Sequence, residues 1–209
     1  MRVRPIGERP GFREALRRGL GDPRRIDGAV ASAEEAGLEG RRLVPAAVLV
    51  PIVGHASAPT ILLTVRTDHL EHHAGQICFP GGRIEPQDRH PVAAALREAA
   101  EETGIDPARV EILGSLPPHD TVTGFRIHPV VGWLEPPVEW HPDPFEVAEV
   151  FELPLAVALA SASYRRESGG DGAVGRGYWV LMWQGRRIWG ATARILRQFA
   201  SIFEGGEEG

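Results

Sequence analysis

Residues 82–105, GRIEPQDRHPVAAALREAAEETGI, form the stretch around which the rest of the chain is organised. Pro91 suits the first position of a helix, and residues 92–102 contain no Gly, Pro or Asn. Gly104 suits the residue just beyond a helix end. The segment therefore predicts a helix that begins at Pro91 and ends before Gly104.

Three carboxylates share one face of this predicted helix. Glu98, Glu101 and Glu102 stand at positions i, i+3 and i+4, where like charges repel by roughly 0.2–0.5 kcal/mol per pair. Two of them also lie in the last turn, where the helix dipole is negative. A hard divalent cation would make the arrangement favourable, because Mg²⁺ takes oxygen ligands and keeps several waters for substrate phosphates.

The alternative is an acidic helix face that only contacts solvent, which is the usual role of charged helix faces. Two neighbouring features favour a metal site instead. Arg97 lies four residues before Glu101 and can steer its carboxylate. The segment Phe79-Pro80-Gly81-Gly82 can bring bare backbone close to a ligand, because glycine has no Cβ in the way. We therefore predict a metal site on the three glutamates.

Residues 97–105, REAAEETGI, resemble the second half of the Nudix hydrolase signature, Arg-Glu-apolar-x-Glu-Glu-x-Gly-apolar. The first half of that signature is Gly, five residues, Glu and seven residues. Here Asp88 stands where Glu is usual, and Gly82 lies one residue farther upstream. The preceding run, residues 62–82, LLTVRTDHLEHHAGQICFPGG, resembles the second motif of the coenzyme A pyrophosphatase branch of this family. Within it, Glu71 replaces the usual Arg and Thr67 replaces the usual Ser or Ala.

The resemblance implies an α/β fold, the Nudix-type α/β/α sandwich with a mixed β-sheet. Strands before and after a central helix, followed by late helices, favour the same architecture. The resemblance also implies Mg²⁺ or Mn²⁺ on Glu98 and Glu102, with Glu101 bound directly or through water. The reaction implied is hydrolysis of a phosphoanhydride bond in a nucleoside diphosphate linked to another group.

The branch implies coenzyme A, free or acylated, as the substrate, cleaved to 4′-phosphopantetheine and 3′,5′-ADP. One alternative is a broader diphosphatase that acts on ADP-ribose, NADH or nucleotide sugars. Another is a Nudix-fold ligand-binding regulator without turnover. The clustered carboxylates speak against the regulator, since a pure binding module has no need of them.

Other residues receive roles in the same scheme. Arg97 would hold Glu101, and Asp88 would support the loop before the helix. Glu101 is the first choice for the general base. Glu146 and Glu149 are the candidates that a later segment could return to the site, and Glu149 is the second choice for the base. Contacts to the phosphates are expected from Arg66 and from the glycines of the loop before the helix, Gly75, Gly81 and Gly82.

Composition excludes several other classes of chemistry. The net charge of −5 gives no indication of a nucleic-acid partner, and an anionic substrate must meet local positive charge or a metal. All 23 basic residues are Arg, and the chain has no Lys and no Asn. This excludes a lysine Schiff base, a Walker-type lysine and N-glycosylation. Cys78 is the only cysteine, which excludes an internal disulfide and indicates a small buried side chain.

No apolar stretch approaches the roughly 20 residues that span a bilayer, so we expect no membrane partner and a cytoplasmic location. The 209 residues suit one domain with extensions. We expect an N-terminal helical extension over residues 1–42, a Nudix hydrolase domain over residues 43–203 and a disordered acidic tail over residues 204–209. A homodimer is the assembly we expect if the chain associates. The five tryptophans are expected to be mostly core or hairpin residues, with base stacking as the alternative for one of them. Residues 178–183 and 186–189, joined by Gln184-Gly185, are expected to form that hairpin, and residues 117–123 are expected to form a loop. Within the N-terminal extension, residues 12–20 and 27–38 show two weak helical patterns.

Overall fold

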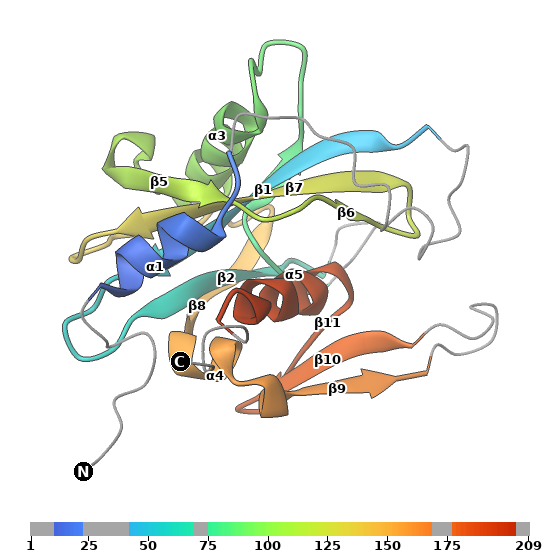
Figure 1. Ribbon diagram of the computed structural model, residues 1–209. Coiled ribbons are helices and arrows are strands. Elements are labelled where there is room, and N and C mark those ends of the chain that lie inside the picture. The colour runs from blue at the N-terminus through green and yellow to red at the C-terminus, as the bar shows by residue number, and fades with distance from the viewer. Residues whose placement is uncertain (1–10, 23–41, 69–74, 169–176, 204–209) are drawn as a thin grey trace.

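The computed structural model describes residues 11–22, 42–68, 75–168 and 177–203 (Figure 1). The first half of the chain contains α1 (Phe12–Gly19), β1 (Val44–Val53), β2 (Thr60–Arg66), β3 (Ile77–Cys78), β4 (Gly81–Arg83), α3 (Pro91–Thr103) and the 3₁₀ turn η2 (Pro107–Arg109). The second half contains β5 (Val110–Ser115), β6 (His119–Asp120), β7 (Phe125–Leu134), β8 (Val147–Pro154), α4 (Leu155–Leu159), η3 (Ser161–Ser163), β9 (Tyr164–Glu167), β10 (Tyr178–Trp183), β11 (Arg186–Trp189) and α5 (Gly190–Ser201).

A mixed sheet forms the middle layer. Its central path runs β3-β2-β1-β7-β5, with β4 paired to β1, β6 to β7 and β8 to β2. β1 and β7 are parallel along their whole length, from Val44 opposite Phe125 to Val53 opposite Leu134. The other pairs within this sheet are antiparallel. The sheet confirms the predicted α/β class and its mixture of strand directions.

Helices cover both faces of this sheet. In Figure 1, α3 lies above the central strands, while α5 and α4 lie below them. A compact cluster of apolar side chains fills the α3 side and includes Leu49, Leu62 and Ala95. A larger cluster fills the opposite side and includes residues of α1, α4 and α5. The predicted α/β/α sandwich is therefore confirmed.

A second, three-stranded sheet follows in the order β11-β10-β9. Its β10–β11 hairpin was expected from the Gln184-Gly185 turn. Both turn residues have positive φ, 46° and 78°, as the tight turn that matches strand twist requires. The predictions lacked β9, β4 and β6, which are short and have no apolar alternation of their own. For β6 we expected a loop, but the buried carboxylate of Asp120 pairs with Arg126 at 2.8 Å and pins this segment to β7.

The first helix packs on the domain. The Phe12 ring stacks on Phe203 with a centroid distance of 5.4 Å, and Arg17 pairs with Glu111. After this helix, Gly21 forms an antiparallel β-bridge with Ser115, the last residue of β5. The second helical pattern of the extension, residues 27–38, and the acidic tail lie outside the described residues, so the proposed domain limits stay predictions.

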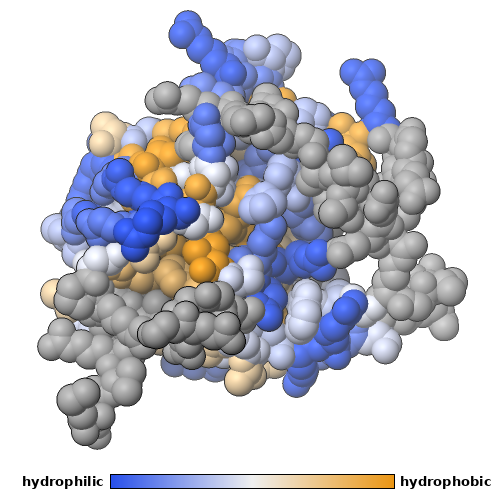
Figure 2. All heavy atoms as spheres, viewed as in Figure 1, coloured by the Kyte–Doolittle hydropathy of each residue, from blue (hydrophilic) through white to orange (hydrophobic). Residues whose placement is uncertain are grey.

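On the face shown in Figure 2, hydrophobic residues gather around the position that α1 occupies in Figure 1, and hydrophilic residues cover most of the remaining coloured surface. Within the described ranges, every helix is too short or too polar to cross a lipid bilayer.

Candidate active site

The central helix begins and ends where its sequence predicts. Pro91 occupies the first turn, and the ring nitrogen Nδ1 of His90 accepts a hydrogen bond from the backbone N–H of Ala93 at 3.2 Å. Gly104 has a φ of 71° and closes the other end, where its N–H donates to the carbonyl of Ala100. This left-handed residue ends α3 directly after its acidic last turn.

Glu102 is a buried carboxylate whose negative charge is only partly balanced by its neighbours. Its side chain is 4% exposed and accepts a hydrogen bond from the backbone N–H of Gly81 at 3.1 Å. The nearest guanidinium nitrogen, Nη1 of Arg66, lies 3.7 Å from its Oε1. Burial raises the pKa of Glu102 to about 8, although the Gly81 hydrogen bond and the Arg66 charge both act to lower it. The position therefore favours a further positive charge.

Glu98 lies one turn earlier and faces the same glycine pair. A Cβ at position 82 would lie 2.4 Å from Cδ of Glu98, and a Cβ at position 81 would lie 2.4 Å from the carbonyl oxygen of Ala47. Position 81 requires glycine because the clash there is with backbone, and at position 82 a Cβ would force the Glu98 carboxylate to move. Burial raises the pKa of Glu98 as well, and the neighbouring Arg97 opposes this effect. The two glycines thus give the two carboxylates room beside bare backbone.

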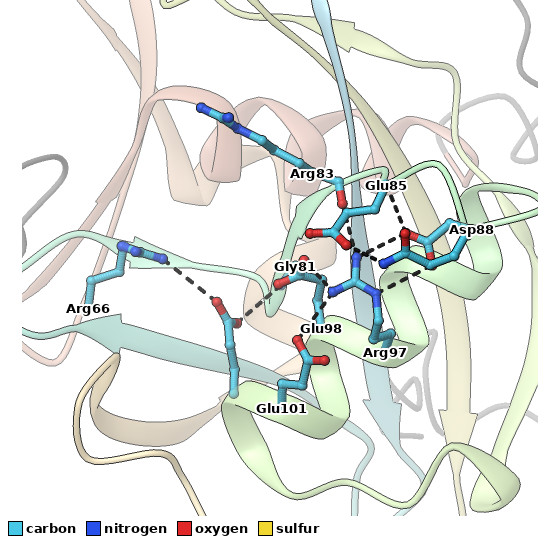
Figure 3. A network of polar contacts seen from close by, with 10 residues as sticks. Arg66, Gly81, Arg83, Glu85, Asp88, Arg97, Glu98 and Glu101 are labelled. Carbon is cyan, nitrogen blue, oxygen red and sulfur yellow. Dashed lines mark hydrogen bonds and ion pairs between the residues drawn. The ribbon is translucent and has the colours of Figure 1, made fainter.

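Arg97 organises the outer part of the cluster (Figure 3). Its Nε and Nη2 donate to the two carboxylate oxygens of Asp88 at 3.3 and 2.9 Å. Its Nη1 donates to Glu98 at 2.8 Å and to Glu101 at 3.2 Å. The predicted contact between Arg97 and Glu101 is present, and Glu98 shares the same guanidinium. The hydrogen bonds from Arg97 lower the pKa of Asp88, so Asp88 stays ionised.

Asp88 also organises the loop before α3. One of its carboxylate oxygens accepts the backbone N–H of Glu85 at 2.9 Å, and its own N–H donates to the Glu85 carbonyl at 2.9 Å. Asp88 thus joins the loop to Arg97, in the supporting position expected from the sequence.

Glu101 differs from the other two glutamates. Its side chain is 61% exposed and leans on Arg97. Across the described part of the chain, no three His, Cys, Asp or Glu side chains converge into a ready-made metal site. Glu98 and Glu102 therefore form a pair, and Glu101 lies at its solvent edge.

The two later candidates, Glu146 and Glu149, occupy different surroundings. Glu149 lies opposite Val65 in the sheet, and its carboxylate binds Arg186 through two hydrogen bonds of 2.8 and 2.6 Å. Its strand neighbour Phe151 packs in the cluster on the side away from α3. The structure therefore does not bring Glu149 to the carboxylate pair.

Glu146 is the residue of the two that approaches the site. Its backbone carbonyl accepts the N–H of Thr67 at 3.0 Å, at the end of β2. After burial and local hydrogen bonds, the negative charge of Glu146 also raises the pKa values of Glu98 and Glu102. Glu146 lies in the turn before β8, whereas Glu149 lies within the strand and shares the face of Phe151, because alternate strand residues point to the same side.

Comparisons with known proteins assign the chain. The family model described as NUDIX domain matches residues 33–167. The chain belongs to the Nudix hydrolase family. Proteins named "Uncharacterized Nudix hydrolase NudL" from Salmonella paratyphi B and Salmonella newport are each 45% identical to it over 155 residues, which is 74% of this chain and 80% of theirs. Among solved structures, a C. elegans Ap4A hydrolase binary complex is similar with a TM-score of 0.46 and 21% identity, over 53% of this chain and 80% of that one.

Of the residues predicted to contact phosphate, Arg66, Gly81 and Gly82 lie beside the same carboxylates, and Gly75 is bonded to the backbone of Arg66. Arg66 ends β2, and its guanidinium reaches toward the carboxylate of Glu102. Figure 3 draws this contact, and the contact from Gly81 to the same carboxylate, as dashed lines. Gly75 has a φ of 67°, and its N–H donates to the carbonyl of Arg66 at 3.2 Å, which closes the loop between β2 and β3. Residues 69–74 of that loop, including His69, Glu71, His72 and His73, lie outside the described residues.

Cys78 lies close to this group. Burial raises the pKa of its thiol to about 11, and its Sγ lies 3.2 Å from Oγ1 of Thr64. A thiol with a raised pKa is a poor nucleophile at neutral pH, which agrees with the packing role expected for it.

A divalent metal fits the donor set that the structure presents. Glu98 and Glu102 offer hard oxygen ligands on successive turns, and a side chain at Gly82 would displace the Glu98 carboxylate. Both carboxyl groups have raised pKa values, because their negative charges are buried with too little positive charge nearby. Glu101, at the solvent edge, could join through water or by turning away from Arg97.

Proposed function

We propose that this Nudix domain hydrolyses the phosphoanhydride bond of a nucleoside diphosphate linked to another group, with Mg²⁺ or Mn²⁺ held by Glu98 and Glu102. The observation that carries the proposal is the buried Glu102 beside Glu98 over the Gly81-Gly82 backbone. A bound divalent ion would supply charge neutralisation of the diphosphate and a lowered pKa for the attacking water. Family membership supports the reaction class.

The protein's own residues would orient the substrate and move the proton. The guanidinium of Arg66 lies 3.7 Å from the Glu102 carboxylate, so it could donate hydrogen bonds to a phosphate oxygen bound beside that carboxylate. Water attacks phosphorus, the P–O–P bridge breaks, and the leaving phosphate departs as the second product. Glu101 is our choice for the group that accepts the water proton, because it is exposed and held in place by Arg97. Glu146 replaces Glu149 as the second choice, since it is the one that faces the pair.

We propose coenzyme A, free or acylated, as the substrate, with 4′-phosphopantetheine and 3′,5′-ADP as products. The support is the resemblance of residues 62–82 to the coenzyme A pyrophosphatase motif, together with the guanidinium of Arg66, whose Nη1 lies 3.7 Å from Oε1 of Glu102. A cytoplasmic location, a homodimer and the lack of a nucleic-acid or membrane partner remain predictions. Sedimentation of the purified protein would test the homodimer.

The test is a comparison of kcat/KM for coenzyme A, ADP-ribose, NADH and the dNTPs with Mg²⁺ and with Mn²⁺. The proposal expects the highest value for coenzyme A and none without metal. A similar value for all the dinucleotides would instead favour the broader diphosphatase. Binding of a nucleotide without any metal-dependent cleavage would favour the regulatory module.

A further inference from the structure

The turn before β8 is tied by its backbone to both elements that carry the site. The N–H of Asp143 donates to the carbonyl of Glu102 at 3.0 Å, in the last turn of α3. The N–H of Thr67 donates to the carbonyl of Glu146 at 3.0 Å, directly after Arg66 at the end of β2. The turn therefore bridges the helix that carries the carboxylate pair and the strand that ends at Arg66.

Within this turn, Asp143 accepts three successive backbone N–H groups. Its Oδ1 accepts the N–H of Phe145 at 2.8 Å, and its carbonyl accepts the N–H groups of Glu146 at 3.1 Å and of Val147 at 2.8 Å. The carbonyl of Glu146 is bonded as well, because it accepts the N–H of Thr67. The backbone of Glu146 is therefore held from both sides, and the reach of its carboxylate depends only on its own side-chain angles.

Thr67 adds a side-chain anchor to the same turn. The residue is 6% exposed, and its hydroxyl donates to the backbone carbonyl of Phe145 at 2.8 Å. One such bond by itself only satisfies a buried hydroxyl, as buried polar groups require. Here, however, the N–H and the hydroxyl of Thr67 bind the successive carbonyls of Phe145 and Glu146. The peptide unit that joins Phe145 to Glu146 is thus bonded on both sides, to Thr67 and to Asp143.

Glu146 lies where its charge reaches the carboxylate pair, and it is itself partly buried. Burial is the largest cause of the raised pKa values of Glu98 and Glu102, and the negative charge of Glu146 raises both further. A third acidic group at this range increases the local attraction for a divalent cation, because opposite charges attract more strongly where little water lies between them. The place of Glu146 relative to the pair therefore matters for metal binding and for turnover.

We propose that Thr67 is a positioning residue that holds Glu146 beside the Glu98–Glu102 pair during hydrolysis. This inference rests on the proposed function and names the contact that keeps the third acidic group in range of the other two. Thr67 acts through the backbone of the turn rather than by contact with the substrate. Loss of its hydroxyl frees the carbonyl of Phe145, and Glu146 can then move away from the pair.

Variants of Thr67 test this role. Thr67→Val removes the hydroxyl at nearly constant volume, Thr67→Ser retains it, and Thr67→Ala replaces Thr67→Val if the latter does not fold. Thr67→Val should lower kcat by about three- to tenfold, the scale of one lost hydrogen bond, with KM nearly unchanged and with recovery in Thr67→Ser. Thr192→Val is the control, because Thr192 is also buried and its hydroxyl donates to the carbonyl of Ile77 at 3.0 Å. The control should lose melting temperature and keep its kcat.

A double-mutant cycle separates positioning from stability. Glu146→Gln should lower kcat and weaken Mn²⁺ binding about tenfold, measured by electron paramagnetic resonance of the free ion. Thr67→Val should weaken Mn²⁺ binding when Glu146 is present, and should change neither quantity further when it is added to Glu146→Gln. If the effects of the two substitutions add in full, or if Thr67→Val lowers only the melting temperature, Thr67 is a structural residue and the inference is wrong.

The failure of this inference differs from the failure of the proposed function. If Glu98→Gln and Glu102→Gln abolish cleavage but Thr67→Val leaves kcat and Mn²⁺ affinity unchanged, the hydrolase proposal stands and the positioning role is overturned. If the wild type cleaves no substrate, the Mn²⁺ titrations of the same variants still decide whether Thr67 acts through Glu146.

Discussion

The backbone N–H of Gly81 donates to Oε2 of Glu102 at 3.1 Å, so the loop before α3 and the last turn of α3 meet at a buried carboxylate. This contact depends on a helix end and a glycine pair that lie about twenty residues apart in the sequence.

The glycine at position 82 can be tested by adding one methyl group. In Gly82→Ala the new Cβ would lie 2.4 Å from Cδ of Glu98, so the carboxylate must move away from the pair. We expect kcat/KM to fall by about a hundredfold or more, the scale of losing one electrostatic contact in a transition state. Gly21→Ala is the control, because its Cβ would have only ordinary contacts, the nearest at 3.5 Å from Ser115. Equal activity of the two variants would contradict the geometry.

Protonation of Glu102 predicts an unusual dependence of stability on pH in metal-free protein. The pKa of Glu102 rises from an ordinary 4.5 to about 8 on folding, so between these values the folded state holds a proton that the unfolded state has lost. Stability therefore falls as pH rises through this window. In Glu102→Gln the group is neutral at all pH values and this loss disappears.

We accordingly expect Glu102→Gln to melt several degrees higher than the wild type in EDTA at about pH 8. For a chain of this size, each kcal/mol of unfolding free energy shifts the melting temperature by about 2–4 °C. At about pH 5 the melting temperatures of wild type and variant should differ less, because the side chain at position 102 is then neutral in both folded proteins. Addition of Mg²⁺ should raise the melting temperature of the wild type and not of the variant. A variant less stable than the wild type at the higher pH would argue against a poorly compensated buried charge.

Asp88 predicts a supporting effect on the metal site. Asp88→Asn keeps the size of the side chain but removes the charge that holds Arg97, which in turn contacts Glu98 and Glu101. We expect Mg²⁺ to be needed at about 10–100-fold higher concentration for half-maximal rate, as for other residues that orient metal ligands. Titration of the initial rate with Mg²⁺ measures this. If Asp88→Asn needed the same Mg²⁺ concentration as the wild type, the contact between Asp88 and Arg97 would not orient the metal ligands.

The two late glutamates predict opposite results. Glu146→Gln should lower kcat and shift the pH–rate profile, because its charge acts on Glu98 and Glu102. Glu149→Gln removes a partly exposed pair with Arg186 and should change stability by only about 0–1 kcal/mol, with kcat unchanged. A loss of kcat in Glu149→Gln alone would return the base assignment to the residue chosen from the sequence.

Local signals predicted much of this protein because they are short-range. Pro91 and Gly104 marked the ends of α3, and the Gln184-Gly185 turn marked a hairpin, since each depends on a few neighbouring dihedral angles. The carboxylate spacing likewise predicted the Glu98–Glu102 pair as neighbours on one helix.

What the sequence did not predict depends on contacts between distant segments. Glu101 lies apart from Glu98 and Glu102 because its carboxylate accepts a hydrogen bond from Arg97, and Asp88 holds Arg97 in place. The position of Glu149 follows from the parity of β8 and from Arg186, 37 residues later.

The most direct measurement is the turnover of coenzyme A by Glu98→Gln and Glu102→Gln in saturating Mg²⁺, with circular dichroism to establish that both are folded. The account predicts native folding and a rate at least about a hundredfold below the wild type in each variant. Folded variants that cleave the substrate at nearly the wild-type rate would show that these two carboxylates do not hold the metal, and the proposed active site would be wrong.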